Sequence, residues 1–393
     1  MKNLFPLAFA TFVFILPLGM LVPLLPFMVL DYEGSSFWAA GIFAVFSGAS
    51  LIAAPFWGRM ADRFGRKPTM AICALITCLS YYWIGIADSA AEIIFSRMLA
   101  GLGAGWLTCA QAYVADTLPE DKRAHGMGLL GASFGAGFTI GPGIGAYIAS
   151  FPTEFARANY GDAVDLSAVI TLLAFIVLLL LVREPENRTI REQHFSLRGF
   201  GIVWRDPQLR IIMAIYGLSA LVFTSIEGSF ALWAHINFQA TPSQVGYWLV
   251  FGGIVTIIVQ GGLVGRCKAH FGERTMVITA IICFMLALLA LIIIDTPPIL
   301  ALIPLGLMAL ALGLHNPIMQ GVISRLAPPR KRGGIMGLAG SCHSLARVIG
   351  PTVAGLMMAH TTILLTYGLV MIVALGALGL LLKQNILHQR PNR

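Results

Sequence analysis

Long apolar segments alternate with short polar segments along nearly the whole chain. A helix needs about 20 mostly apolar residues to span a bilayer, and twelve runs of roughly this length can be marked. They lie at residues 4–30, 37–57, 69–87, 91–113, 126–150, 166–183, 209–235, 244–264, 275–294, 298–320, 333–359 and 362–383. The pattern therefore predicts twelve transmembrane helices. The first run continues to Leu30 without a clear cleavage site, so we interpret it as a membrane helix and not as a signal peptide.

The composition agrees with a protein that lies in lipid. Of the 393 residues, 58% are hydrophobic and 11% are charged, whereas a soluble domain is about 45–50% apolar and about 25% charged. The net charge of +8 can indicate a nucleic-acid partner, but the basic residues lie in short loops, which argues against one. The six cysteines form no CxxC or zinc spacing, so we interpret them as packing residues and predict no metal and no cofactor.

The basic residues are distributed unevenly between the loops. Nearly all of the 26 Lys and Arg residues fall in every second loop or near the termini, and the other set of loops holds only Arg157. Because positively charged loops stay in the cytoplasm, both termini are predicted to be cytoplasmic, which requires an even number of helices. The longest polar stretch, 184–207, is then a cytoplasmic linker between one six-helix half at 1–183 and another at 208–393.

Three motifs occur once in each half. "GRMADRFGRKP" at 58–68 returns in altered form as "GRCKAHFGERT", "PEDKRAHGMGLLG" as "PPRKRGGIMGLAG", and "GPGIG" as "GPTVAG", each 207 or 209 residues later. Such spacing indicates a duplicated six-helix unit, and an even number of helices per unit makes the repeats parallel. The second copy of the first motif has Ala269 and Glu273 where the first has Asp62 and Arg66, which predicts that the second is the weaker of the two.

These motifs resemble signatures of a known transporter family. "GRMADRFGRKP" is similar to the loop between helices 2 and 3 of the major facilitator superfamily. "RMLAGLGAG" at 97–105 is similar to its helix 4 motif, and "GFTIGPGIG" at 137–145 to the helix 5 motif of its drug:proton antiporter branch. The resemblance covers essentially the whole chain. It implies two six-helix halves around a central cavity that opens alternately to the two sides of the membrane, and it implies an exporter.

The first motif is a dense charge cluster between two apolar runs. Its glycines allow helix ends to approach closely and permit a tight turn, because glycine reaches positive φ at little cost. Asp62 can accept hydrogen bonds from helix N-terminal amides or from an arginine, and the arginines can reach acids such as Asp116. The resemblance implies a gate latch that holds the cytoplasmic gate shut; the alternative is a cluster that only fixes topology and loop order. The latch residues are Gly58, Arg59, Asp62, Arg63, Gly65, Arg66 and Asp116.

The run 126–150 is rich in glycine. Gly137, Gly141 and Gly145 recur at every fourth position, so two backbones can pack tightly there in lipid, and Pro142 can kink the helix. The expected partner is the run 244–264 of the other half. The "GLGAG" of the preceding run follows no predicted strand and is interpreted as helix packing, not as a dinucleotide loop. The chain contains no GxxxxGK[ST], which argues against ATP-driven transport.

Ionisable residues within predicted membrane helices are costly in lipid and are expected to face the bundle interior or water. Glu227 is predicted to be a proton site; the alternative is a pore-mouth residue hydrogen-bonded to its neighbours. In the family resembled, Arg97 is tied to proton or substrate handling; alternatively it snorkels to the outer headgroups.

His343 and Arg347 share a helix face. Histidine changes charge near neutral pH, so His343 is the second candidate for proton coupling unless it only packs. Arg347 is predicted to point into the cavity or to pair with another helix.

Further polar and aromatic residues are candidates for the cavity wall beside Arg347, although each also fits a packing role. They are Trp106, Gln111, Tyr113, Gln260, His315 and Asn316. The tetracycline exporters resembled carry an aspartate at the position of Phe14, which argues against tetracycline itself and against coupling through the first run. Two intramembrane arginines against one glutamate favour an anionic or zwitterionic substrate.

The sequence therefore predicts an all-α membrane protein with the major facilitator fold, and no paired-acid, HExxH or Ser/His pattern suggests an enzyme. The predicted function is proton-coupled export of a small organic molecule or drug by alternating access, by a monomer in the inner (plasma) membrane of the cell. The first alternative is proton-driven uptake or export of an anionic metabolite or siderophore, and the distant alternative is a non-transporting membrane sensor. The expected partners are membrane lipid, a small-molecule substrate and protons.

Overall fold

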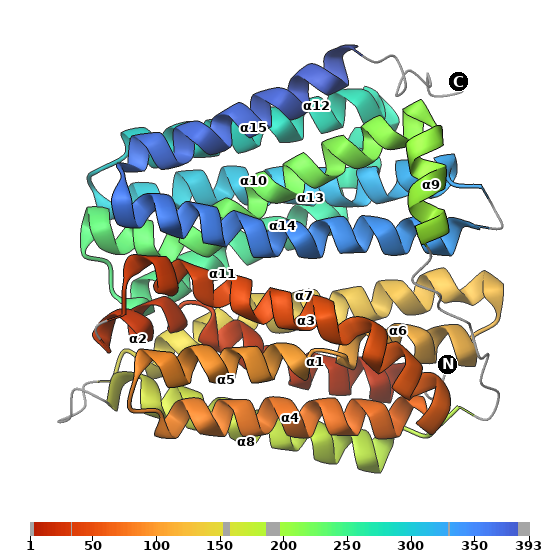
Figure 1. Ribbon diagram of the computed structural model, residues 1–393, viewed down its shortest axis with the longest axis horizontal. Helices are drawn as coiled ribbons and strands as arrows, with labels where there is room; N and C mark the ends of the chain where they lie inside the picture. Colours follow the sequence, from red (N-terminus) through yellow and green to blue (C-terminus); the bar gives the residue numbers. More distant parts are fainter. Residues whose placement is uncertain (1–3, 33, 152–157, 186–196, 329–330, 384–393) are drawn as a thin grey trace. The chain divides into compact units, whose positions relative to one another are not determined.

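The computed structural model describes residues 4–32, 34–151, 158–185, 197–328 and 331–383 (Figure 1). Most of this part of the chain is helical, and no strand occurs within it. It contains ten helical spans that are long and apolar enough to cross a membrane, and the longest, Pro242–Ile293, has 52 residues and includes two of the predicted runs. This confirms the predicted all-α membrane fold class.

One further helix, α14 (Arg332–His360), has sufficient length but a more polar composition. Its 29 residues extend for about 44 Å at 1.5 Å per residue, which exceeds the ~30 Å hydrocarbon core of a bilayer. Glycines, serines, His343 and Arg347 interrupt its apolar positions, and it is not among the ten apolar spans. Such a composition suits a helix that borders protein or a water-filled path instead of lipid.

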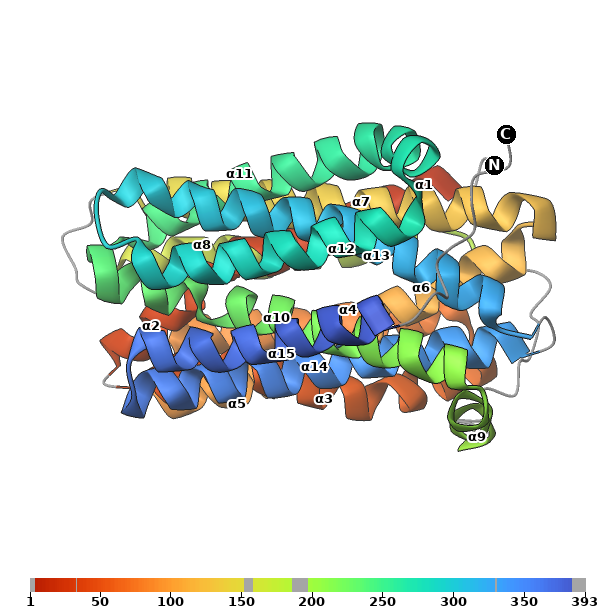
Figure 2. The ribbon, with the colours of Figure 1, turned by 90° about the horizontal axis from the view of Figure 1, so that it is seen from above.

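The helices form two compact units, Met1–His194 with Thr241–Val250, and Phe195–Ala240 with Phe251–Arg393 (Figure 2). The first unit contains α1 (Leu4–Leu21), α2 (Leu25–Asp31), α3 (Ser36–Phe64), α4 (Arg66–Ile86), α5 (Ala90–Leu102), α6 (Trp106–Thr117), α7 (Glu120–Ile148) and α8 (Ala158–Leu181). The second contains α9 (Leu197–Arg205), α10 (Pro207–Phe238), α12 (Val264–Ile293), α13 (Leu302–Leu326), α14 and α15 (Ile363–Lys383). α11 (Pro242–Ile258) begins in the segment grouped with the first unit and leads through a π-helical turn, Val259–Leu263, into α12.

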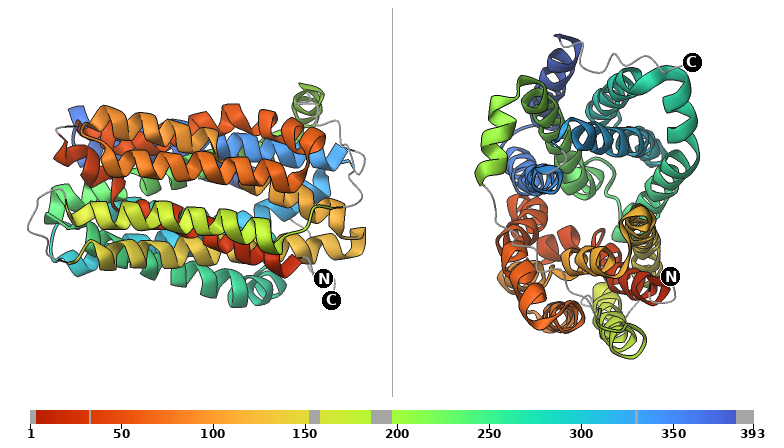
Figure 3. Two further views of the ribbon diagram at one scale, coloured as in Figure 1. Left: turned by 90° about the horizontal axis from the view of Figure 1, so that it is seen from below. Right: turned by 90° about the vertical axis from the view of Figure 1, so that its right-hand side faces the viewer.

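The same helix pairs pack together in each unit. In the first unit, α1 packs against α7 and α8, and α4 packs against α5 and α8. In the second unit, α10 packs against α14 and α15, and α12 packs against α13 and α15. Each bundle, seen along its helices in the right-hand view of Figure 3, has its own core of buried side chains, around Trp106 in the first and Met319 in the second. This recurrence supports the duplication predicted from the repeated motifs.

Two predicted helices are divided. The first run splits into α1 and α2 near Pro23, which has no N–H and whose ring clashes with a helical carbonyl group. The Val22 N–H bonds instead to the Gly19 carbonyl oxygen at 3.3 Å. The fourth run splits into α5 and α6 around Gly103 and Gly105, where a Cβ on Gly103 would lie 2.8 Å from the Thr77 hydroxyl.

Two segments predicted as polar connections contain helix. α8 begins at Ala158, so the expectation that residues 151–165 form a loop is wrong for its second part; residues 152–157 lie outside the described part of the chain. The predicted linker 184–207 contains α9, which its short length hid from a search for membrane-spanning runs. Residues 186–196 of that linker also lie outside the described part.

Candidate functional site

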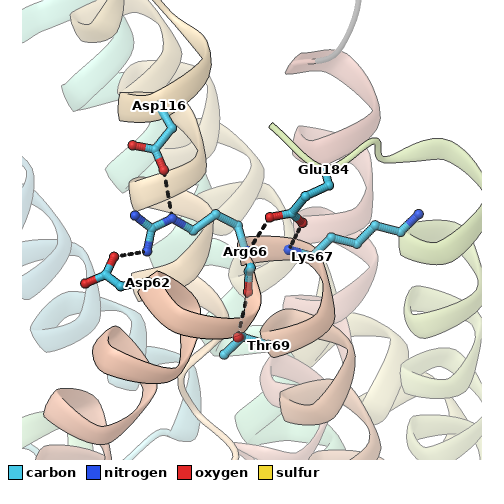
Figure 4. A network of polar contacts seen from close by, with 7 residues as sticks. Asp62, Arg66, Lys67, Thr69, Asp116 and Glu184 are labelled. Carbon is cyan, nitrogen blue, oxygen red and sulfur yellow. Dashed lines mark hydrogen bonds and ion pairs between the residues drawn. The ribbon is translucent and has the colours of Figure 1, made fainter. Parts of the chain in front are cut away.

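The charge cluster of the first motif lies where α3 meets α4 (Figure 4). Gly65 separates the two helices with φ 116° and ψ 159°, which confirms the predicted glycine turn. Arg66, the first residue of α4, is 3% exposed. Its Nη1 lies 2.5 Å from Asp62 Oδ1, and its Nε donates to Asp116 Oδ2 at 2.8 Å. Of the two partners considered for Asp62, the structure shows the arginine.

Glu184 completes the cluster and was not predicted. Its two carboxylate oxygens accept hydrogen bonds from the backbone N–H groups of Arg66 and Lys67, each at 2.7 Å (Figure 4). These amides have no partner inside α4, and a carboxylate at a helix N-terminus is stabilised by the helix dipole. One weak signal of this role is present in the sequence: Glu184 follows directly after a predicted membrane run that ends on the side where α4 begins.

We call Asp62, Arg66, Asp116 and Glu184 the Arg66 cluster. It joins α3, α4, α6 and the segment after α8. The side chains of Asp62 and Asp116 are 16% and 2% exposed, and charges in such surroundings are tolerated only when they are paired. The cluster therefore fixes this end of the first unit.

The other predicted latch residues lie outside these contacts. Gly58 is buried within α3, and Arg59 and Arg63 are exposed. The Arg63 guanidinium lies over the neighbouring Phe64 ring, 5.3 Å from its centroid. The two exposed arginines are therefore available to partners outside the Arg66 cluster.

The second copy of the motif keeps both the turn and an ion-paired cluster. Gly272 interrupts α12 with φ 75°, in the position that corresponds to Gly65. Next to it, Glu273 pairs with Arg325, and its Oε1 lies 2.9 Å from Lys268 Nζ. We call Lys268, Glu273 and Arg325 the Glu273 cluster.

The Glu273 cluster repeats the main pair of the Arg66 cluster with the charges exchanged. Glu273 stands at the position of Arg66, and Arg325, 209 residues after Asp116, stands at the position of that acid. The sequence predicted only that the second copy is the weaker one; the structure adds that the pairing is kept there and that its polarity is reversed. Because Lys268 and Arg325 are 47% exposed, their ion pairs are of the surface type that contributes only about 0–1 kcal/mol.

A second ion pair joins α10 to α14 within the second unit. Arg347 Nη2 lies 3.1 and 3.2 Å from the two carboxylate oxygens of Glu227. The side chains are 34% and 21% exposed, so the pair is partly accessible although both helices have membrane length. Arg347 thus pairs with another helix, as one of the two expectations had it, and its charge is compensated.

Aromatic and imidazole rings extend this polar region. The His343 ring lies 6.3 Å from that of Tyr216 on α10, and Tyr216 stacks on His315 of α13 at 6.0 Å and 6°. The atoms His343 Nδ1 and His315 Nε2 are buried without a hydrogen-bond partner in the described part of the chain. Glu227, Arg347 and these three rings lie on α10, α13 and α14 of the second unit, and we call them the α10–α14 site.

Arg97 is enclosed within the first unit. It is 1% exposed, so its side chain points into the protein and not toward outer headgroups. Its guanidinium lies 4.6 Å from the centroid of the Phe46 ring and beside the Tyr81 hydroxyl. These contacts offset part of the cost of a buried charge.

Trp106 is fully buried and does not line an open surface. Its Nε1 donates to Thr11 Oγ1 at 3.1 Å, and its ring stacks on Phe14 with centroids 4.4 Å apart. The position at which the tetracycline exporters resembled carry an aspartate is therefore filled by an aromatic pair.

The remaining cavity candidates are divided between the two units. The Tyr113 hydroxyl donates to the Arg183 carbonyl oxygen at 2.6 Å, which places it between α6 and the end of α8. Gln111 and Gln260 are exposed, and Asn316 is half-buried. Among the described residues, no group of three or more His, Cys, Asp or Glu side chains could hold a metal ion.

Three glycines of α7 face α1. A Cβ on Gly141 would lie 2.5 Å from the Leu16 carbonyl oxygen and 2.8 Å from Gly19 Cα, and Gly137 and Gly145 meet the α1 backbone in the same way. α7 stays helical through the proline of the motif, Pro142. The predicted close approach of backbones is seen with α1, which was not the expected partner. The expected partner run contains α11, and a Cβ on Gly246 of α11 would lie 2.8 Å from the Pro142 carbonyl oxygen of α7.

Two similar helical bundles with polar groups inside membrane-length helices are typical of a membrane transporter. The comparison with known families agrees. The family model "Major Facilitator Superfamily" matches residues 7–351, and a second match covers residues 218–392. The chain belongs to this superfamily.

Two relatives and one solved structure illustrate the similarity. Multidrug resistance protein 2 of Bacillus subtilis (strain 168) is 29% identical over 377 residues, which cover 93% of this chain and 91% of the relative. The class E tetracycline resistance protein of Escherichia coli is 27% identical over 365 residues, 88% of this chain and 85% of the relative. The crystal structure of the human organic anion transporter MFSD10 superposes with a TM-score of 0.72 at 22% identity, covering 97% of this chain and 99% of that one, and supports the fold.

Proposed function

We propose that the protein exports a small organic molecule in exchange for protons, with Glu227 as the coupling group. The observation that carries this proposal is the partly exposed pair of Glu227 and Arg347 between two membrane-length helices. The relatives named for multidrug and tetracycline resistance support export. At the position where the tetracycline exporters carry an aspartate, this chain has Phe14, whose ring stacks on Trp106. We therefore do not propose tetracycline as the substrate of this protein.

The chemistry of the pair links the proton to the substrate. When Glu227 is ionised, it neutralises Arg347. When Glu227 takes up a proton, the ion pair is lost, and an unpaired guanidinium in these surroundings is costly. A cationic or hydrogen-bonding substrate that binds Glu227 competes with the proton, and competition for one carboxylate produces exchange of the two.

An anionic substrate leads to a different coupling. It would bind the Arg347 guanidinium, which is 34% exposed, and it would bind best when Glu227 is protonated. Proton and substrate would then move together. This is our second candidate function, proton-driven transport of an anionic metabolite or siderophore, and the coupling direction separates it from the first.

We further propose how the remaining groups contribute. His343 is the second candidate for the coupling group, and Arg97 provides a fixed positive charge in the first unit. The Arg66 cluster keeps the cytoplasmic end of the first unit rigid, so that this unit moves as one body during alternating access. The protein is proposed to act as a monomer in the inner membrane with both termini in the cytoplasm.

The test uses everted membrane vesicles energised by respiration, with a dye that reports the internal pH. A panel of drugs, siderophores and carboxylates is added to vesicles with the parent, Glu227→Gln, Arg347→Gln or the exposed control Asp295→Asn. We expect some compound to collapse the pH gradient in the parent and the control, but not with Glu227→Gln. If Glu227→Gln responds like the parent, Glu227 is not the coupling group.

A second arm separates the two candidate functions. Proteoliposomes with an imposed pH gradient are loaded with each active compound, and the direction of its movement relative to protons is recorded. Opposite movement supports exchange, and movement together with protons supports the anionic alternative. A compound whose transport depends on Arg347 and not on the size of the pH gradient would contradict both.

A further inference from the structure

The short helix α9 has a different direction from the membrane-length helices of the second unit. In Figure 1, α9 lies across the right-hand ends of α10 and α14, whereas those helices run along the unit. It packs against both of them. A helix of nine residues that lies across the end of a membrane bundle is placed to lie in the plane of the membrane surface.

The two sides of α9 have different surroundings. Val203 is 7% exposed and belongs to the core of the second unit, with Ile202 packed against that core. On the opposite side, Trp204 is 62% exposed, and Arg205 is exposed next to it. One face thus fixes α9 to the unit, and the other carries an indole and a guanidinium outward.

Arg210 of α10 adds a second cation to the exposed side. Its guanidinium lies 5.6 Å from the centroid of the Trp204 ring, and its Nη1 donates to the Trp204 carbonyl oxygen at 3.3 Å. Neither Arg205 nor Arg210 forms an ion pair with a carboxylate in the described part of the chain. We call Trp204, Arg205 and Arg210 the α9 patch.

We propose that the α9 patch binds the headgroup of an anionic phospholipid in the cytoplasmic leaflet. Tryptophan is favoured at the boundary between headgroups and acyl chains, which is where the exposed indole would lie. The guanidinium groups of Arg205 and Arg210 would bind the phosphate oxygens, because arginine binds phosphate in a bidentate geometry. The inference is independent of the transported substrate.

A lipid is the occupant that these observations favour over a soluble anion or a phosphorylated protein. The patch combines an apolar ring with two cations, and it lies at the end of membrane-length helices where headgroups are already present. A soluble anion would use only the cations and would leave the 62% exposed indole in water. The lipid uses both.

The first experiment measures the contact of Trp204 with lipid. The full-length protein is placed in nanodiscs of phosphatidylcholine and phosphatidylglycerol whose acyl chains are brominated near the headgroup. The quenched fluorescence is compared between the parent and Trp204→Phe, because the chain has seven tryptophans. We expect the quenched component to be smaller in Trp204→Phe; equal quenching in the two proteins would overturn the proposal.

The second experiment measures headgroup preference. Binding of fluorescent phosphatidylglycerol is followed in phosphatidylcholine nanodiscs that hold the parent, Arg205→Gln/Arg210→Gln, or the matched control Arg266→Gln/Lys383→Gln, which removes two other exposed cations of the same unit. Each basic side chain at an anionic surface contributes about a fivefold preference, so the α9 double variant should bind about thirtyfold more weakly. An equal loss of phosphatidylglycerol binding in the control variant would show that binding depends on general surface charge, and it would overturn the proposed lipid site.

Two checks keep the result interpretable. The variants must have the parent's Tm in pure phosphatidylcholine, which shows that the fold is intact. Glycerol phosphate is added as a soluble competitor that has the headgroup chemistry without the chains. If it displaces the labelled lipid at comparable concentration, the site recognises a soluble phosphate and the proposal of a lipid site is wrong.

Discussion

Replacing Arg66 by glutamine should destabilise the first unit far more than the corresponding change destabilises the second. Arg66→Gln leaves the Asp62 and Asp116 carboxylates, 16% and 2% exposed, without their cation. Removal of one partner from a buried ion pair costs about 3–5 kcal/mol. Glu273→Gln leaves two cations that are 47% exposed and can be hydrated, so it should cost about 1 kcal/mol or less.

The assay follows the fraction of monodisperse protein that survives heating in detergent. In a unit of this size, 1 kcal/mol corresponds to about 2–4 °C, so Arg66→Gln should lower the apparent Tm by roughly 10 °C and Glu273→Gln by roughly 3 °C. Equal shifts for the two variants would refute the argument from burial. Such a result would show that the glycine turn, and not the paired charges, determines the stability of both clusters.

A double variant identifies the source of the cost. If the uncompensated carboxylate is responsible, Arg66→Gln/Asp116→Asn should recover much of the stability that Arg66→Gln loses, since the most deeply buried charge is gone. The equivalent pair Glu273→Gln/Arg325→Gln should show little coupling. Additive losses in the first pair would mean that the arginine contributes mainly by packing and not by charge.

Two further changes test local geometry. Gly141→Ala places a Cβ 2.5 Å from the Leu16 carbonyl oxygen and should lower the free energy of unfolding by about 1–3 kcal/mol. The control Gly135→Ala has nothing within 4 Å of its Cβ and should leave the Tm nearly unchanged. Similar Tm shifts in the two variants would contradict tight α1–α7 packing. Glu184→Gln removes the charge at the α4 N-terminus and should lower the stability of the first unit by about 1 kcal/mol. The same heating assay measures it. A Tm shift as large as that of Arg66→Gln would show that Glu184 does more than cap α4.

The membrane helices could be predicted from the sequence because lipid makes a local demand. Each spanning segment must satisfy its own backbone hydrogen bonds and present apolar side chains along its full length, so the signal lies within a single run. The break at Pro23 is also local, but it lies inside a continuous apolar run that hides it. α9 was missed because a helix of nine residues meets neither the length nor the composition of a spanning helix.

The charge pairs could be predicted only in part, because they depend on contacts between distant segments. The motif that contains Asp62 and Arg66 suggested a nearby acid, and Asp116 was among the candidates. Glu184 accepts a hydrogen bond from the backbone N–H of Arg66, 118 residues earlier. Its polarity alone indicates only a linker residue. The partner of Glu227 lies 120 residues away, and a single sequence does not show which of two possible environments Arg347 occupies.

The exchanged polarity of the two clusters shows which feature of the motif the fold requires. A glycine with positive φ joins two helices at Gly65 and again at Gly272, and in both units the next residue pairs with a residue near the C-terminal end of a neighbouring helix. Because arginine and glutamate both serve at that position, the requirement is for a charge pair across the junction and not for a given sign. The two clusters differ in burial. The Arg66 cluster is shielded from water and salt, while the cations of the Glu273 cluster are hydrated and screened. It follows that ionic strength acts on the junction of the second unit and leaves that of the first largely unchanged, so the two halves of a duplicated protein respond unequally to the same medium.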